Sequence, residues 1–361
     1  MSKPLPSLIF IPDISGFTQF VNKTEIAHGQ HIIAELLEIL IDANDLDLTL
    51  SEIEGDAILF YKHREAPDTE AVVRQAEKMF FDFHSHLKKY ESQRICQCGA
   101  CKTAFNLTLK VIVHSGELDF IKVKGRTKPY GSDLILAHRL LKNNIQGKEY
   151  LLLTDDYLKT QSPQALSLPH WASLENGMTD YEELGKVCYQ YTSLSPLRQS
   201  IPEPPAKSPA LTSRKPVISK VHIEKPRVEV FETVIDFEKR MKWNKFAKDI
   251  KFDKDHVNQV GAKHICVFDD TTVSFESVTN DFGKEYLVYG ERVLDPPKIV
   301  KEMVQYFILA ENGHGTNVQV ETHYELKPVI GFIMNPFLRR TMRRLSEKAL
   351  QSLKTWCESQ D

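Results

Sequence analysis

Long hydrophobic runs are absent from this chain of 361 residues. No stretch approaches the roughly 18 consecutive apolar residues of a transmembrane helix, so no membrane-spanning segment is expected. Residues 1–6 carry no long apolar core, so no export signal is expected either. A strong charge of one sign is also absent, because the net charge of −3 gives no general attraction to nucleic acid. These absences favour a cytoplasmic protein without a nucleic-acid partner.

Cysteine is scarce, with six residues in the whole chain. In a cytoplasmic protein these six are expected to be thiols or metal ligands rather than disulfides. The hydrophobic fraction of 42% and the charged fraction of 26% are typical of globular domains, which excludes a disordered or fibrous chain. At about 150 residues per domain, the length predicts two domains.

A proline-rich segment divides the chain. Residues 196–216 hold six prolines with serine and lysine between them, namely Pro196, Pro202, Pro204, Pro205, Pro209 and Pro216. Repeated proline prevents regular strand pairing, so this segment is predicted to be a semi-rigid linker. The expected domains are therefore residues 1–195 and residues 217–361.

The N-terminal domain alternates strand and helix patterns. Short apolar runs predict strands at residues 8–11, 46–54, 57–61, 107–113, 150–153 and 188–194. Apolar faces with helical spacing predict helices around residues 32–41, 72–87 and 133–142. Interleaved helices and strands are typical of an α/β or α+β sandwich.

The C-terminal domain has a different pattern. Strands are predicted at residues 217–223, 264–268, 271–278, 286–293, 304–310 and 318–326, and short helices at 228–235 and 237–243. The domain ends in one long helix. Mostly apolar residues recur along one side of it at steps of three and four residues, namely Leu338, Met342, Leu345, Ala349, Ser352, Leu353 and Trp356. The expected architecture is a curved antiparallel sheet that grips a long helix.

Two aspartates stand at the ends of predicted strands. Asp13 follows the run Phe10-Ile11-Pro12, and Asp56 lies in the turn between two strands. If these strands pair, both carboxylates converge at one sheet edge, where close carboxylates attract a divalent cation. Gly16 lets the backbone approach a ligand closely, and a helix that starts after it favours phosphate. The alternative is that both are ordinary turn or capping aspartates.

Four segments together resemble the catalytic domain of class III nucleotidyl cyclases, over about residues 5–195. They are Phe10-Ile11-Pro12-Asp13-Ile14-Ser15-Gly16-Phe17, residues 52–60, Val113-His114-Ser115-Gly116-Glu117 and residues 130–140. The resemblance implies an α+β fold with a ferredoxin-like βαββαβ core that works as a homodimer. It also implies a phosphorus–oxygen lyase that forms a cyclic nucleotide from ATP or GTP.

The resemblance further implies how the site is built. Asp13 and Asp56 would hold two Mg²⁺ or Mn²⁺ ions, with the backbone carbonyl of Ile14 as a further ligand. The two ions would activate the ribose 3′-hydroxyl and clamp the triphosphate. The nucleotide would lie against Gly16 and Phe17.

Two basic residues match family positions that act on phosphate. Arg139 matches the transition-state arginine, which the other subunit supplies, and Lys186 matches the phosphate-binding lysine. Ile135 departs from the family, because it occupies the position of an asparagine that orients the ribose and it cannot donate a hydrogen bond. This departure predicts weakened turnover.

The positions that select the base are also unusual. Glu52 occupies a position where adenylyl members carry lysine and guanylyl members carry glutamate. Lys128 occupies a position where adenylyl members carry aspartate and guanylyl members a small residue. The pair is charge-reversed relative to the adenylyl pattern, so Glu52 and Lys128 are predicted to face each other as an ion pair. Alternatively, Glu52 accepts hydrogen bonds from a guanine edge.

A second candidate metal site is the segment Cys96-Gln97-Cys98-Gly99-Ala100-Cys101. Closely spaced thiolates can bind zinc, and Gly99 favours the knuckle turn. A tetrahedral site needs a fourth ligand, for which the candidates are His84, His86, His114 or a partner chain. The alternative is a loop of reduced thiols.

Residues 217–361 resemble the START-like (SRPBCC) helix-grip superfamily, which includes polyketide-cyclase-like members. The resemblance rests on the order of the elements and on residues 231–244. Such folds enclose an apolar cavity between sheet and helix, so an apolar small molecule is an expected ligand.

Three functions are compatible with these features. The first is a homodimeric nucleotidyl cyclase for signalling, whose output is set by a ligand of the C-terminal domain. The second is a degenerate cyclase-like protein that binds nucleotide and metal without efficient chemistry, as Ile135 suggests. The third is a protein that mainly binds an apolar small molecule.

Overall fold

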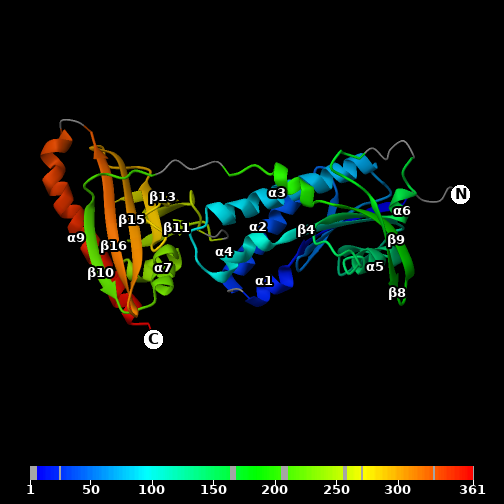
Figure 1. The fold of residues 1–361 in the computed structure, drawn as a ribbon, viewed down its shortest axis with the longest axis horizontal. Helices are drawn as coiled ribbons and strands as arrows, with labels where there is room; N and C mark the ends of the chain where they lie inside the picture. Colours follow the sequence, from blue (N-terminus) through cyan, green and yellow to red (C-terminus); the bar gives the residue numbers. More distant parts are fainter. Residues whose placement is uncertain are drawn as a thin grey trace. The chain divides into compact units, whose positions relative to one another are not determined.

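The computed structural model describes residues 6–23, 26–162, 168–204, 210–254, 258–269, 271–327 and 330–360. The chain folds into two compact units, and the main boundary between them along the chain falls between Pro204 and Pro205 (Figure 1). Residues 205–209 of the expected linker lie outside the described residues. None of the described helices has the length and apolar character that crossing a membrane requires.

A seven-stranded sheet with the order β2-β3-β1-β4-β7-β9-β8 forms the first unit. Its strands are β1 (Ser7–Ser15), β2 (Thr49–Glu54), β3 (Ala57–Lys62), β4 (Thr108–Gly116), β7 (Tyr150–Thr154), β8 (Glu175–Tyr181) and β9 (Gly185–Ser193). The helices along this part of the chain are α1 (Phe17–Lys23), α2 (Ile26–Asp42), α3 (Thr69–Ser92), α4 (Gly99–Thr103), α5 (Ser132–Arg139) and α6 (Asp155–Leu158), with short 3₁₀ turns at Ala104–Asn106 and Ser195–Ser200. The segment Ser92–Cys101 is grouped with the second unit.

The first four strands of this sheet have the ferredoxin-like topology. β1 pairs antiparallel with both β3 and β4, and β2 pairs antiparallel with β3. α2 connects β1 to β2, and α3 lies between β3 and β4 along the chain, so the order is βαββαβ. The predicted α+β fold with a ferredoxin-like core is confirmed.

β1 is a central strand that is buried on both faces. Ile9 and Ile11 pack against Ala137 and Leu140 at α5. Phe10 points to the other face, because side chains alternate along a strand, and it is fully buried as well. Burial on both faces explains the unbroken apolar run in the sequence.

Two local predictions in this unit need correction. The second strand begins at Thr49 rather than at residue 46, because residues before it form a turn. The side chain of Asn44 bonds both backbone groups of Leu48, and Asp47 has a positive φ of 57°. The hairpin of β5 (Asp119–Val123) and β6 (Arg126–Tyr130) was not predicted, because its residues are almost all exposed and carry no apolar alternation.

A second seven-stranded sheet, entirely antiparallel, forms the second unit in the order β10-β16-β15-β14-β13-β12-β11. Its strands are β10 (Val217–Ile223), β11 (Asp249–Phe252), β12 (Lys263–Val267), β13 (Thr272–Val278), β14 (Leu287–Val293), β15 (Val300–Asn312) and β16 (Gly315–Leu326). Its helices are α7 (Arg227–Ile235), α8 (Phe237–Trp243) and α9 (Ile330–Glu358). Figure 1 shows α9 along β10 and β16, which is the predicted helix-grip arrangement.

A group of buried polar side chains fills the space between α8 and this sheet. The guanidinium of Arg240 bonds the carboxylate of Glu291, which also accepts a hydrogen bond of 2.9 Å from the hydroxyl of Tyr289. His264 Nε2 lies 3.2 Å from the same carboxylate. All four side chains are buried, so this part of the space between α8 and the sheet is packed with side chains.

A cavity of about 590 Å³ lies on the other face of this sheet. Gln305 donates a hydrogen bond to Ser346 of α9, so Gln305 faces the helix. Side chains alternate between the two faces along a strand, so Ile308, three residues after Gln305, points to the opposite face. There it lines the cavity together with Gln319, its partner on the neighbouring strand. The cavity was expected between sheet and helix, and the structure instead places this one on the face away from α9.

Candidate functional site

Asp13 and Asp56 meet at one edge of the first sheet. Asp13 lies opposite Ala57 in the β1–β3 ladder, which brings it beside the turn that holds Asp56. The backbone N–H of Ile14 donates a 3.0 Å hydrogen bond to the carbonyl of Asp56 and fixes that turn. Burial, followed by the charge of Asp13, raises the pKa of Asp56 to about 6. The structure therefore brings together the two carboxylates that the sequence singled out.

Lys110 is a further member of this group that the sequence analysis missed. It lies directly opposite Asp13 in the β1–β4 ladder, and its Nζ is 2.8 Å from Asp13 Oδ2. The same Nζ donates to the backbone carbonyl of Leu141 at 3.0 Å. One ammonium faces two carboxylates, so the group retains excess negative charge when both acids are ionised. The available signal was a charged lysine inside a mostly apolar strand, 107–113.

The raised pKa of Asp56 implies a cost to stability that can be measured. The pKa of this carboxyl is higher in the folded protein, about 6, than in the unfolded protein. Its ionisation therefore destabilises the fold fully above about pH 6, and this effect disappears as the pH falls below about 4. Without added divalent ions, Asp56→Asn should raise the free energy of unfolding at pH 7. We expect a gain on the order of 1 kcal/mol, since Asp56 is partly solvated.

Thermal unfolding of wild type and Asp56→Asn at pH 7 and pH 4 checks this expectation. The difference in Tm should be positive at pH 7 and should vanish toward pH 4. Asp156→Asn, at an exposed position paired with Lys159, serves as the control and should change Tm little at either pH. A lower Tm for Asp56→Asn at pH 7 would contradict the repulsion between the two acids.

A glycine separates β1 from the helix that follows it. Gly16 comes directly after the last residue of β1, Ser15, and has a φ of +93°, a left-handed conformation that L side chains rarely adopt; α1 begins at Phe17. Ile14, whose carbonyl was expected to be a metal ligand, is fully buried and lies opposite Leu109 in the β1–β4 ladder. This turn keeps backbone groups close to the carboxylates.

Glu52 and Lys128 form the expected ion pair. Lys128 Nζ lies 2.6 Å from Glu52 Oε2. Glu52 follows an irregularity in the pairing of β2 with β3, and Lys128 comes from the β5–β6 hairpin. The hydrogen bond from Lys128 to Glu52 raises the pKa of the lysine. The side chain of Lys128 is 55% exposed, so water weakens the attraction between the two charges.

The remaining predicted residues lie at the surface of the unit. Arg139 ends α5, is 59% exposed and pairs with Glu183 at 3.7 Å. Lys186 is exposed and lies opposite Asp180 in the β8–β9 ladder. Ile135 is also exposed, on α5. Among the described contacts, neither basic side chain reaches the two aspartates of its own chain.

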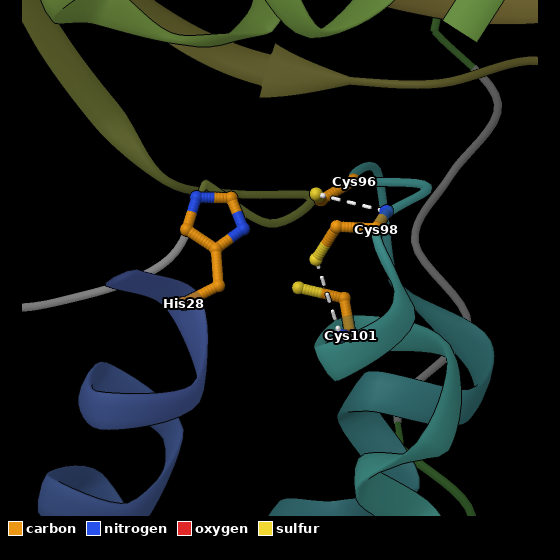
Figure 2. Close-up of side chains that lie close together, drawn as sticks. All are labelled: His28, Cys96, Cys98 and Cys101. Carbon is orange, nitrogen blue, oxygen red and sulfur yellow. Dashed lines mark hydrogen bonds between the residues drawn. The ribbon is translucent and has the colours of Figure 1, made fainter. Parts of the chain in front are cut away.

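The three predicted cysteines gather with a histidine that the sequence analysis missed. Figure 2 shows Cys96, Cys98 and Cys101 facing His28 from α2. One ligand atom from each of the four lies within 4.8 Å of the other three. All three cysteines are buried, and Cys101 lies in α4. His28 lies far from the cysteines in the chain, so spacing gave no signal for it.

The histidines expected as a fourth ligand have other partners. His84 Nε2 lies 3.1 Å from Glu149, and His86 Nε2 lies 2.8 Å from Glu35. His114 Nδ1 lies 2.9 Å from the hydroxyl of Thr154. The expectation for these three residues was therefore wrong.

Two family models match parts of this chain, and solved structures similar to each part are known. Residues 33–150 match a family model described as a protein of unknown function, DUF2652. Residues 217–358 match the model of polyketide cyclase / dehydrase and lipid transport proteins. Among solved structures, the adenylyl cyclase CyaB from P. aeruginosa is 13% identical, covers 52% of this chain and 93% of its own, and has a TM-score of 0.37. The ZhuI aromatase/cyclase from a Streptomyces species is 15% identical, covers 40% of this chain and 93% of its own, and has a TM-score of 0.34.

A protein of known sequence gives the family directly. The uncharacterized protein Rv2561/Rv2562 of Mycobacterium tuberculosis is 31% identical over 169 residues, which are 45% of this chain and 74% of the mycobacterial protein. The first unit has a ferredoxin-like core within its seven-stranded sheet, and the second unit contains the segment that matches the polyketide cyclase / dehydrase and lipid transport model. This chain therefore belongs to the family of Rv2561/Rv2562.

Proposed function

We propose that the first unit binds a nucleoside triphosphate through divalent cations and converts it into a cyclic nucleotide. The observation that carries this proposal is the convergence of Asp13 and Asp56 at one edge of the sheet. Among the residues that the structure describes, Lys110 is the one ammonium found beside these two carboxylates, so without a cation the partly buried acids repel each other. Their placement is therefore better explained by a cation that both carboxylates bind.

The residues present suit Mg²⁺ or Mn²⁺. Both carboxylates offer oxygen donors, which these ions prefer. Burial, followed by the charge of Asp13, raises the pKa of Asp56, and the charge of Lys110 offsets this only in part. When bound, the ions would neutralise the triphosphate and activate the ribose 3′-hydroxyl.

The proposed reaction is an internal phosphoryl transfer. The ribose 3′-oxygen forms a bond to the α-phosphorus, and the bond from that phosphorus to the bridging oxygen of the β-phosphate breaks. Pyrophosphate leaves, and the proton of the hydroxyl passes to water. Arg139, which is exposed in its own chain, would act from the second subunit of a homodimer and stabilise the negative charge on the oxygens of the α-phosphate.

A second candidate function is nucleotide binding without turnover. Ile135 is exposed on α5 and offers no hydrogen bond to a ribose. A protein of this kind would bind a metal–nucleotide complex and release it unchanged.

Incubation with ATP or GTP and Mn²⁺, followed by mass spectrometry, separates the candidates. A cyclic product that disappears in Asp13→Asn and Asp56→Asn, and persists in the Asp156→Asn control, supports the cyclase. Metal-dependent nucleotide binding without product supports the second candidate. Neither product nor binding would overturn both.

The ion pair of Glu52 and Lys128 is proposed to flank the base. Each single change, Glu52→Lys or Lys128→Glu, places like charges opposite each other and should weaken nucleotide binding. Because the pair is largely exposed, the expected loss of nucleotide affinity is no more than a few-fold. The double variant should recover most of that loss in a calorimetric titration.

A double variant that binds nucleotide no better than either single variant would refute the pairing of Glu52 with Lys128. A measured preference for ATP over GTP would count against recognition of guanine by Glu52.

The cavity of the second unit is proposed to hold a small molecule that sets the activity of the first. Phe282, Tyr286 and Ile308 offer apolar surface there, with Lys220 and His222 at its side. Mass spectrometry of an organic extract of the purified protein would test this. An extracted compound that no longer copurifies with Ile308→Trp, which fills the cavity, would support the site.

A further inference from the structure

We propose that Cys96, Cys98, Cys101 and His28 together bind one zinc ion with a structural role. The proposal does not depend on the cyclase function, because none of these residues belongs to the group of Asp13 and Asp56. It names a complete set of four ligands, whereas the cysteine spacing alone provides only three.

The geometry of the cluster is close to that of a tetrahedral site. Zinc lies about 2.3 Å from thiolate sulfur and about 2.0 Å from imidazole nitrogen, so tetrahedral donors stand roughly 3.5–3.8 Å apart. In the structure the four ligand atoms all lie within 4.8 Å of one another. Small side-chain rotations, of about 1 Å at the ligand atoms, would complete the site.

The backbone around the cysteines already supports metal-bound sulfur. The N–H of Cys98 donates to Cys96 Sγ, and the N–H of Cys101 donates to Cys98 Sγ, each at 3.4 Å (Figure 2). Hydrogen bonds from amides to sulfur favour the thiolate over the thiol, and they orient the sulfur toward the metal. Cys98 directly precedes α4 and Cys101 lies within it, so the two sulfurs are held by one turn of backbone.

The chemistry of the four ligands selects zinc rather than the ions expected at Asp13. Three sulfurs and one imidazole suit a soft or borderline cation, whereas Mg²⁺ and Mn²⁺ prefer oxygen. Four protein ligands leave no open position for water or substrate, which is typical of a structural site. The cysteines are buried, so this ion would be shielded from solvent.

Zinc content of the full-length, tag-free protein tests the site. We expect about one zinc per chain by elemental analysis. Cobalt replacement should give the absorption of a tetrahedral thiolate complex. The single changes Cys96→Ser, Cys98→Ser and Cys101→Ser should each remove the metal, whereas the exposed Cys188→Ser should retain it as a matched control. Wild-type protein that neither contains zinc nor gives the cobalt spectrum would overturn the proposal.

His28 requires a separate test, because it is the ligand that only the structure indicates. His28→Ala should weaken zinc binding by about tenfold or more in competition with a chelator, and His28→Cys should restore tight binding. Unchanged affinity in His28→Ala would remove His28 from the site. Asp13→Asn should keep its full zinc content, so failure of the zinc site and failure of the cyclase proposal are distinguishable.

Discussion

Asp13→Asn is expected to reduce formation of cyclic nucleotide by on the order of 10³-fold or more, equivalent to about 4 kcal/mol in the barrier. Asp13 is 7% exposed and central to the carboxylate group, and an amide cannot supply the charge that binds the cation. The amide also leaves Lys110 without its 2.8 Å carboxylate partner. Product formation with Mn²⁺ under saturating nucleotide measures the effect.

A complementation experiment controls for misfolding and tests the dimer at the same time. If Asp13 and Arg139 of one site come from different subunits, mixing Asp13→Asn chains with Arg139→Ala chains creates mixed dimers with one intact site. A two-fold symmetric dimer at equal mixing should recover about a quarter of wild-type activity. Mixed chains as inactive as each variant alone would contradict a shared site.

Arg240→Met should destabilise the second unit by about 3–5 kcal/mol, because it leaves the carboxylate of Glu291 buried without its counter-charge. Arg240 and Glu291 are both nearly inaccessible, and Arg240 also donates to the carbonyl of Val234 through Nε and Nη2. The attraction of Arg240 holds the pKa of Glu291 well below its usual range despite burial. Urea unfolding followed by the fluorescence of Trp243, at the end of α8, reports the change.

The double variant Arg240→Met with Glu291→Gln is the matched comparison. Removing both charges should recover a large part of the lost stability, since replacement of a whole buried pair is far less costly than removal of one partner. A single variant that loses less than about 1 kcal/mol would contradict the burial of the pair.

The sequence predicted the framework of the site because strand pairing follows from simple patterns. The apolar run before Asp13 marked a buried strand, and Gly55-Asp56 marked a tight turn, so their convergence followed from antiparallel pairing. The role of Lys110 was not predicted. Periodicity indicates which face of a strand a residue occupies, but not which residue of the neighbouring strand pairs with it.

Other features depended on contacts between distant residues. Nothing in the spacing of the cysteines indicated His28, which comes from another helix. The hairpin that carries Lys128 has exposed residues and no apolar alternation. The cavity of the second unit is lined by residues from strands far apart in the sequence, and the pattern of a single sequence does not reveal which face of a sheet is hollow.

Counting divalent ions in the presence of a non-hydrolysable nucleotide most directly tests the central claim that Asp13 and Asp56 hold cations beside a triphosphate. Titration with Mn²⁺, followed by electron paramagnetic resonance, should show two ions bound per site in wild type. Asp13→Asn and Asp56→Asn should each lose this binding, and Asp156→Asn should keep it. Nucleotide binding that is equally tight with and without divalent ions, and unchanged in both variants, would contradict the account.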